Sequence, residues 1–139
     1  MSITLRDAVP FLAGIVLAVL VGLFATSFRV DRDRAFYPTV MIVIAVLYLL
    51  FAIMGGSPRA LVYESIFALA FIALALAGLK KSLWIVVAAL AAHGVFDGVH
   101  GRLINDPGVP VWWAPFCLAY DAVAASYLAY LLLREPERA

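Results

Sequence analysis

The amino-acid sequence predicts an all-α integral membrane protein, a helical bundle with five transmembrane helices. Two observations lead to this fold class. Of the 139 residues, 66% are hydrophobic and 14% are charged, with a mean hydropathy of +1.06, whereas soluble domains are about 45–50% apolar and about 25% charged. The apolar residues also fall into stretches of about 20, the length a helix needs to cross a hydrocarbon core of about 30 Å. This composition excludes an ordinary soluble enzyme, a disordered tail and a basic nucleic-acid-binding protein.

Five stretches meet the length requirement, and together they form one transmembrane domain over residues 1–139. We expect helices at residues 9–28, 36–55, 61–79, 82–100 and 111–133. Arg6-Asp7 and Arg29 flank the first stretch, a Gly-Gly-Ser-Pro run ends the second, and Lys80-Lys81 ends the third. Since only these two lysines separate the third helix from the fourth, the two should form a tight antiparallel hairpin.

Three prolines fall near the starts of predicted helices, at Pro10, Pro38 and Pro115. A proline in the first turn removes an N–H group that has no intrahelical partner in any case. Of the three, Pro115 lies late enough in its predicted helix to kink it.

The distribution of basic residues predicts the orientation. With five spans, one side of the membrane carries Arg6, Arg59 and Arg102, and the other carries Arg29, Arg32, Arg34, Lys80, Lys81, Arg134 and Arg138. Under the positive-inside rule, the side with seven basic residues is cytoplasmic. We therefore expect the N-terminus outside and the C-terminus in the cytoplasm.

Ionisable side chains inside the spans mark the candidate site, because burying them in a bilayer costs several kcal/mol on insertion scales. They are Glu64, His93, Asp97, His100 and Asp121. With a rise of about 1.5 Å per residue, all five fall in the outer half of the membrane. This one-sided distribution predicts a single polar cavity that opens toward the outside.

The spacing of these residues predicts which of them meet. His93, Asp97 and His100 are spaced i, i+4, i+7 and share one stripe of a helix. Beside this stripe lie Gly94, Gly98 and Gly101, and the face of Asp121 carries Ala114, Cys117, Ala124 and Ala125. Small residues allow helices to approach closely, so the fourth and fifth helices should bring Asp121 next to His93 and Asp97. The glycine stripe could instead serve a contact between subunits of a homo-oligomer.

Two imidazoles and two carboxylates are a suitable ligand set for a divalent metal such as zinc. The sequence thus predicts a metal site at His93, Asp97, His100 and Asp121, with Glu64 beside it. If such a site left one position open for water, a spare carboxylate, Asp97 or Glu64, could serve as the catalytic base of a hydrolase. Its substrate would be lipid-like, because the cavity opens within a leaflet.

Other interpretations of the same residues stay open. Asp97 can accept hydrogen bonds from both histidines in a network that only stabilises the bundle, or the residues can relay protons in a small transport module. A structural subunit of a membrane complex is a further alternative. Cys117 is either a soft ligand or a small packing residue, and Tyr48 either hydrogen-bonds into the cavity or packs. In each case we expect membrane lipids as partners and expect no nucleic-acid partner.

Several segments resemble a group of small bacterial multi-pass inner-membrane proteins that are classed as domains of unknown function. The segments are Arg34-Ala35-Phe36-Tyr37-Pro38, Ala92-His93-Gly94-Val95-Phe96-Asp97-Gly98-Val99-His100, Asn105-Asp106-Pro107-Gly108-Val109-Pro110-Val111-Trp112-Trp113 and Phe116-Cys117-Leu118-Ala119-Tyr120-Asp121. The resemblance implies an integral membrane protein of similar topology. A looser similarity is to membrane metal-dependent hydrolases that hold zinc with His and Asp on several helices, although those have seven spans and more histidines.

Overall fold

The computed structural model describes residues 5–139, and these residues fold into five long helices without a strand. The helices are α1 (Leu5–Ser27), α2 (Phe36–Met54), α3 (Pro58–Lys80), α4 (Leu83–Leu103) and α5 (Trp113–Arg134). Short 3-10 turns, η1 (Val30–Arg32) and η2 (Pro136–Arg138), follow α1 and α5. All five long helices are long and apolar enough to cross a membrane, which confirms the predicted helical class and the number of spans.

Serine caps determine where two of the helices begin. Ser57 accepts a hydrogen bond from the Ala60 N–H at 3.1 Å, with Pro58 as the first residue of α3, and Ser82 accepts one from the Trp84 N–H at the start of α4. Such caps satisfy N–H groups that the helix leaves without a partner. Because α3 ends at Lys80 and α4 begins at Leu83, the two form the tight hairpin that the sequence predicts.

Pro38 lies in the first turn of α2, as expected, but Pro115 and Pro10 differ from the prediction. Because α5 begins at Trp113, Pro115 is the third residue of the helix, where a missing N–H breaks no helical hydrogen bond. The predicted reason for a kink at Pro115 is therefore absent. Pro10 lies deeper, as the sixth residue of α1, because that helix is already formed at Leu5.

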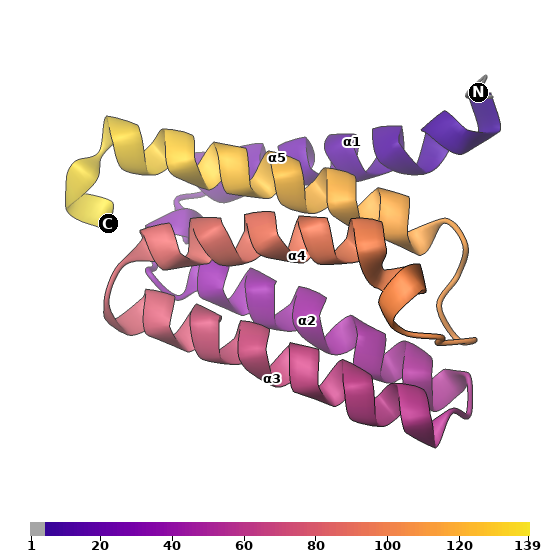
Figure 1. Cartoon of the computed structure of the whole chain (residues 1–139). Helices are drawn as coiled ribbons and strands as arrows, with labels where there is room; N and C mark the ends of the chain where they lie inside the picture. Colours follow the sequence, from indigo (N-terminus) through magenta and orange to yellow (C-terminus); the bar gives the residue numbers. More distant parts are fainter. Residues whose placement is uncertain (1–4) are drawn as a thin grey trace.

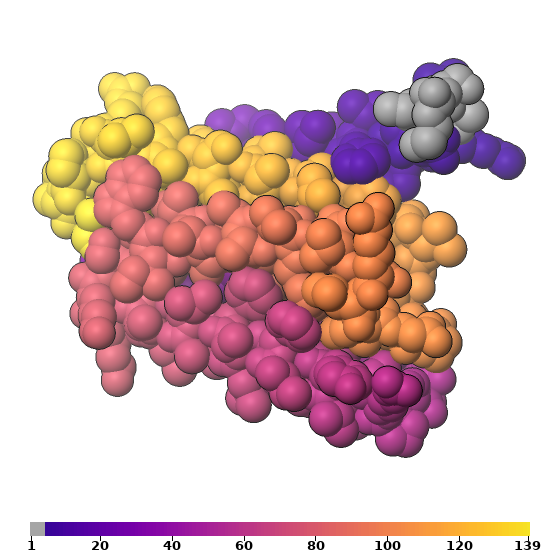
Figure 2. All heavy atoms as spheres, in the orientation of Figure 1, coloured from indigo at the N-terminus to yellow at the C-terminus, as the bar shows by residue number. Residues whose placement is uncertain are grey.

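The helices pack in a definite order, which Figure 1 shows. α1 packs on α5, α5 packs on α4, and α4 contacts both α3 and α2, which pack on each other. Within residues 5–139, α5 is the only long helix with which α1 makes extensive contact. Figure 2 shows α1 along one edge of the molecule and α3 along the opposite edge, with α4 and α5 between them.

Glycines make the close contacts of α5 possible on both of its sides. A Cβ atom on Gly14 of α1 would collide with the Phe116 carbonyl oxygen, and one on Gly22 would touch the Tyr127 ring. On the other side, Gly94 and Gly98 of α4 face Asp121 and Leu118. Gly94 and Gly98 of the glycine stripe thus face α5, as one of the two sequence interpretations expects, whereas Gly101 has no neighbour within 4 Å among the described residues.

Large apolar side chains cover the outside of the bundle. They include Leu12, Leu20, Leu69, Val95 and Leu133, each more than half exposed. Contiguous apolar surface of this kind is typical of a protein surrounded by lipid. The interior holds other large side chains such as Met41, Tyr48 and Leu90, together with small residues and the ionisable side chains of the candidate site.

Candidate metal centre

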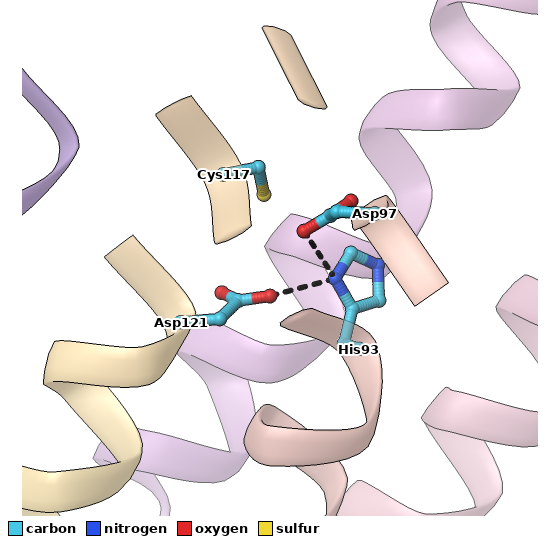
Figure 3. A group of neighbouring side chains, drawn as sticks. All are labelled: His93, Asp97, Cys117 and Asp121. Carbon is cyan, nitrogen blue, oxygen red and sulfur yellow. Dashed lines mark hydrogen bonds and ion pairs between the residues drawn. The ribbon is translucent and has the colours of Figure 1, made fainter. Parts of the chain in front are cut away.

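Three of the predicted site residues meet between α4 and α5. His93 lies at the midpoint of the 21-residue α4, Asp97 follows one turn later, and Asp121 comes from α5. Their exposed fractions are 1%, 2% and 0%. The His93 Nδ1 atom is 2.7 Å from Asp121 Oδ2 and 3.4 Å from Asp97 Oδ2, as Figure 3 shows.

The site lies deeper than the sequence suggests. The predicted fourth helix ends at residue 100, but α4 continues to Leu103, so about 15 Å of helix separates His93 from either end. The centre is therefore close to the middle of the spans.

Cys117 is the fourth member of the cluster. Its thiol and one ligand atom each from His93, Asp97 and Asp121 all lie within 4.8 Å of one another. Figure 3 shows the four side chains converging, with Cys117 and Asp121 on one helix and His93 and Asp97 on the other. The sequence interpretation treated Cys117 as a ligand or a packing residue. The signal that favours a ligand is spacing, since each helix contributes two candidate donors at i and i+4.

Two oxygen atoms in this cluster are buried without a hydrogen-bond partner among the described residues. They are Asp97 Oδ2 and Asp121 Oδ1. Buried polar atoms are nearly always hydrogen-bonded, and an unpaired one raises the free energy of the folded state by about 1–3 kcal/mol. Asp97 Oδ1 is satisfied, because the Tyr48 hydroxyl donates a hydrogen bond to it at 2.6 Å.

His100 and Glu64 form a separate pair. The His100 Nε2 atom and Glu64 Oε1 are 2.5 Å apart, and both side chains are buried. His100 and His93 share one stripe of α4 but have different partners. His100 contacts Glu64 of α3 and Tyr48 of α2, whereas His93 contacts Asp121 of α5. The structure therefore places His100 and Glu64 outside the four-residue cluster.

Tyr48 connects the pair to the cluster. Its ring stacks on the His100 ring with centroids 4.2 Å apart, while its hydroxyl reaches Asp97. Phe71 and Phe96 flank His93, with ring centroids 4.7 and 5.7 Å away. These aromatic rings surround the His93 side of the cluster with apolar surface.

Comparison with protein-family models, with curated proteins and with solved structures finds no match to this chain.

The donor set is one that zinc accepts. Zinc binds imidazole nitrogen, thiolate sulfur and carboxylate oxygen at about 2.0–2.3 Å, so neighbouring ligand atoms in a tetrahedral site are about 3.3–3.8 Å apart. Ligand atoms that already lie within 4.8 Å of one another need only small side-chain shifts to reach this spacing. Magnesium and calcium prefer oxygen ligands alone, so the imidazole and the thiol favour a transition metal.

Proposed function

We propose that this protein is an integral membrane protein that holds one divalent transition-metal ion, for which zinc is the best fit. The ligands are His93, Asp97, Cys117 and Asp121. The observation that carries this proposal is a pair of carboxylate oxygens, Asp97 Oδ2 and Asp121 Oδ1, that accept no hydrogen bond within residues 5–139 and are buried beside an imidazole nitrogen and a thiol.

The charge balance supports a cation at this position. Asp97 and Asp121 are almost completely buried, and an uncompensated charge in such a site is strongly destabilising. A divalent cation beside two carboxylates and a neutral imidazole brings the total charge to zero. When Cys117 binds the ion it does so as a thiolate and releases its proton, which makes the total −1, and the Tyr48 hydroxyl already donates to the Asp97 carboxylate.

The number of ligands decides what the ion does. Four protein ligands are typical of structural zinc sites, whereas catalytic sites use three and keep one position for water. We therefore favour an ion that fastens α4 to α5. Hydrolysis of a lipid-like substrate requires that water replace Cys117 at the ion.

Elemental analysis of the detergent-purified protein tests the proposal. We expect about one equivalent of zinc in the wild type, and loss of the metal in Asp121→Asn, which keeps the volume of the side chain but removes its charge. His100→Ala is the matched control, because His100 is buried on the same helix but outside the cluster, and this variant should keep its metal.

Cys117→Ala separates the two modes of binding. A closed four-ligand site loses most of its metal in this variant, whereas a three-ligand site with water retains it. No metal in the wild type after zinc is added back, or equal metal in wild type and Asp121→Asn, contradicts the proposal. Elution as one symmetrical peak in size-exclusion chromatography verifies that each variant is folded.

A second candidate function, a proton-coupled transport module, is favoured by the continuity of the polar side chains. The polar side chains form one connected series. Hydrogen bonds join Glu64 to His100, Tyr48 to Asp97 and His93 to Asp121, while ring stacking joins His100 to Tyr48 and a 3.4 Å contact joins Asp97 to His93. Proton flux into liposomes under a pH gradient tests it. A relay predicts that Tyr48→Phe, which removes the hydroxyl bound to Asp97, lowers the flux to that of empty liposomes.

The site's location in the cell is part of the proposal. The excess of basic residues on the side that holds the α1–α2 and α3–α4 connections supports a cytoplasmic C-terminus and an external N-terminus in a bacterial inner membrane.

A further inference from the structure

An apolar groove of about 610 Å³ runs between α1, α2 and α5. Its walls include Leu17 and Val21 of α1, Thr39 and Val43 of α2, and Phe116 and Tyr120 of α5. The groove exists because glycines hold α1 close to α5, while α2 is held by α3 and α4. Thus α1 and α2 flank an opening without packing on each other.

The dimensions of the groove match half of a bilayer. Along α2, its lining extends from Phe36 to Leu47, and these eleven helical steps cover about 16 Å. This length is about half of a hydrocarbon core of about 30 Å. Val43 and Leu17 are 51% and 43% exposed, so the groove is open on its lipid-facing side, where an acyl chain from one leaflet can enter it sideways.

The groove is closed at one end by the polar connection between α1 and α2, where Val30 and Asp33 contribute to its lining. The same connection carries Arg29 and Arg32. Within residues 5–139, no carboxylate lies within ion-pair distance of Arg29, and Arg32 has only a 3.8 Å contact with Glu135, both side chains being exposed to solvent. Neither side chain is part of the groove lining, but both lie on the connection at the end of the groove and are available to an anion there.

One of the two carboxylates of this connection is paired with a cation, since Asp31 contacts Arg138 and accepts a hydrogen bond from the Thr26 hydroxyl. Asp33 keeps its negative charge, because its partner is the neutral Ala35 N–H at 2.9 Å. Arg29, Arg32 and Asp33 together therefore leave one net positive charge, which is complementary to a phosphate group.

We infer that the groove is a binding site for one anionic phospholipid. An acyl chain lies along α2 from the α1–α2 connection to the middle of the membrane, and the phosphate lies at Arg29 and Arg32. Cys117 also lines the groove, so the acyl chain ends beside the α5 face of the metal centre. This inference does not depend on whether the cluster binds metal.

Native mass spectrometry of the purified protein in detergent tests the site. The protein is titrated with phosphatidylglycerol and with phosphatidylcholine of the same acyl chains, and the population carrying one lipid is measured. We expect a single phosphatidylglycerol to bind, and Thr39→Phe with Val43→Phe to abolish its binding by filling the groove. The matched control is Val46→Phe with Leu50→Phe, which has the same spacing on α2 but lies outside the groove lining, and should bind like the wild type.

A second pair of measurements tests the headgroup. Arg29→Gln and Arg32→Gln should each weaken phosphatidylglycerol binding by about fivefold, since a basic residue near an anionic headgroup contributes about 1 kcal/mol. Neither substitution should change phosphatidylcholine binding. Equal lipid binding by the groove-filled and control variants overturns the inference. The inference is also overturned if the wild type has the mass of a dimer and the groove-filled variant that of a monomer, because the occupant of the groove is then a second copy of the chain.

Discussion

Asp121 illustrates how one residue determines the chemistry of the interior. It is completely buried, one of its oxygens contacts His93, and the other has no partner among the described residues. A leucine or an alanine at this position would avoid the cost of burying a carboxylate. An ionisable residue within a membrane span is therefore a functional candidate by default.

Removal of the metal should destabilise the wild type but not Asp121→Asn. A ligand that binds only the folded state at about 100 times its dissociation constant stabilises that state by about 2.7 kcal/mol. We therefore expect chelation to lower the thermal midpoint of the wild type and to leave that of Asp121→Asn unchanged. Thermal unfolding in detergent, followed by tryptophan fluorescence with and without a chelator, measures this difference. Equal shifts in both proteins would show that the chelator does not act through the cluster.

The sequence predicts part of the site because spacing within a helix is regular. His93 and Asp97 are one turn apart, and glycine beside them favours close packing of the next helix, so their meeting with Asp121 follows. The position of His100 does not follow. The i+7 spacing places it on the same stripe as His93, but it does not specify that α3 supplies Glu64 as its partner. Cys117 is ambiguous for a similar reason, since a thiol in an apolar helix serves equally well as a packing residue.

At the scale of elements, the contact between α1 and α5 depends on backbone-to-backbone proximity at Gly14. A methyl group there collides with the Phe116 carbonyl oxygen, which belongs to a helix backbone and cannot move aside. We expect Gly14→Ala to reduce the free energy of unfolding by about 1–3 kcal/mol, the usual effect of overpacking. Loss of stability against denaturing detergent measures it.

Gly101→Ala is the control for this substitution. Gly101 lies within α4, and a Cβ atom there has no neighbour within 4 Å among the described residues. Alanine favours a helix over glycine by up to about 1 kcal/mol, so this variant should be as stable as the wild type or more so. A larger loss in Gly101→Ala than in Gly14→Ala would contradict the packing we describe.

The helix boundaries show what hydropathy can and cannot predict. The five stretches of about 20 apolar residues correspond to five helices, but α1 is already helical at Leu5 and α3 begins at Pro58. Both helices extend past the apolar stretch into polar residues, because backbone hydrogen bonding and the Ser57 cap determine the ends. Hydropathy identifies only the part of a helix that is apolar enough to lie in the hydrocarbon core.

On the scale of the whole molecule, Arg34 joins distant parts of the chain. Its guanidinium donates hydrogen bonds to the carbonyl oxygens of Leu79 and Gly78 at the end of α3, and to those of Arg138 and Ala139. The planar guanidinium suits several acceptors at once, whereas an ammonium is a point charge. This one side chain therefore connects the start of α2 to the end of α3 and to the segment after α5.

Arg34→Met should destabilise the bundle by about 1.5–3 kcal/mol, the range for a hydrogen bond to a charged group, and Arg34→Lys should recover only part of the loss. Arg32→Met is the control, because Arg32 is exposed and its only ion pair is long. Thermal unfolding of the three variants in the same detergent ranks them. Equal stability of the Arg34 and Arg32 variants would refute the structural role of Arg34.

The orientation of the molecule is a prediction from its charges. A reporter enzyme that is active only in the cytoplasm should be active when fused after Ala139, and inactive when placed in the α2–α3 connection near Gly56. The reverse pattern would invert the orientation and place the Arg29–Arg34 connection outside.

The packing order of the helices has a consequence for biosynthesis. The principal partner of α1 is α5, and the ribosome produces α5 only after α2, α3 and α4. Until α5 is synthesised, lipid therefore occupies its place beside α1. The helices α2, α3 and α4 can assemble before that. The proposed metal ligands are divided in the same way, since α4 carries His93 and Asp97 and α5 carries Cys117 and Asp121. Insertion of α5 thus brings together the proposed ion site and provides the packing partner of α1 in a single late step.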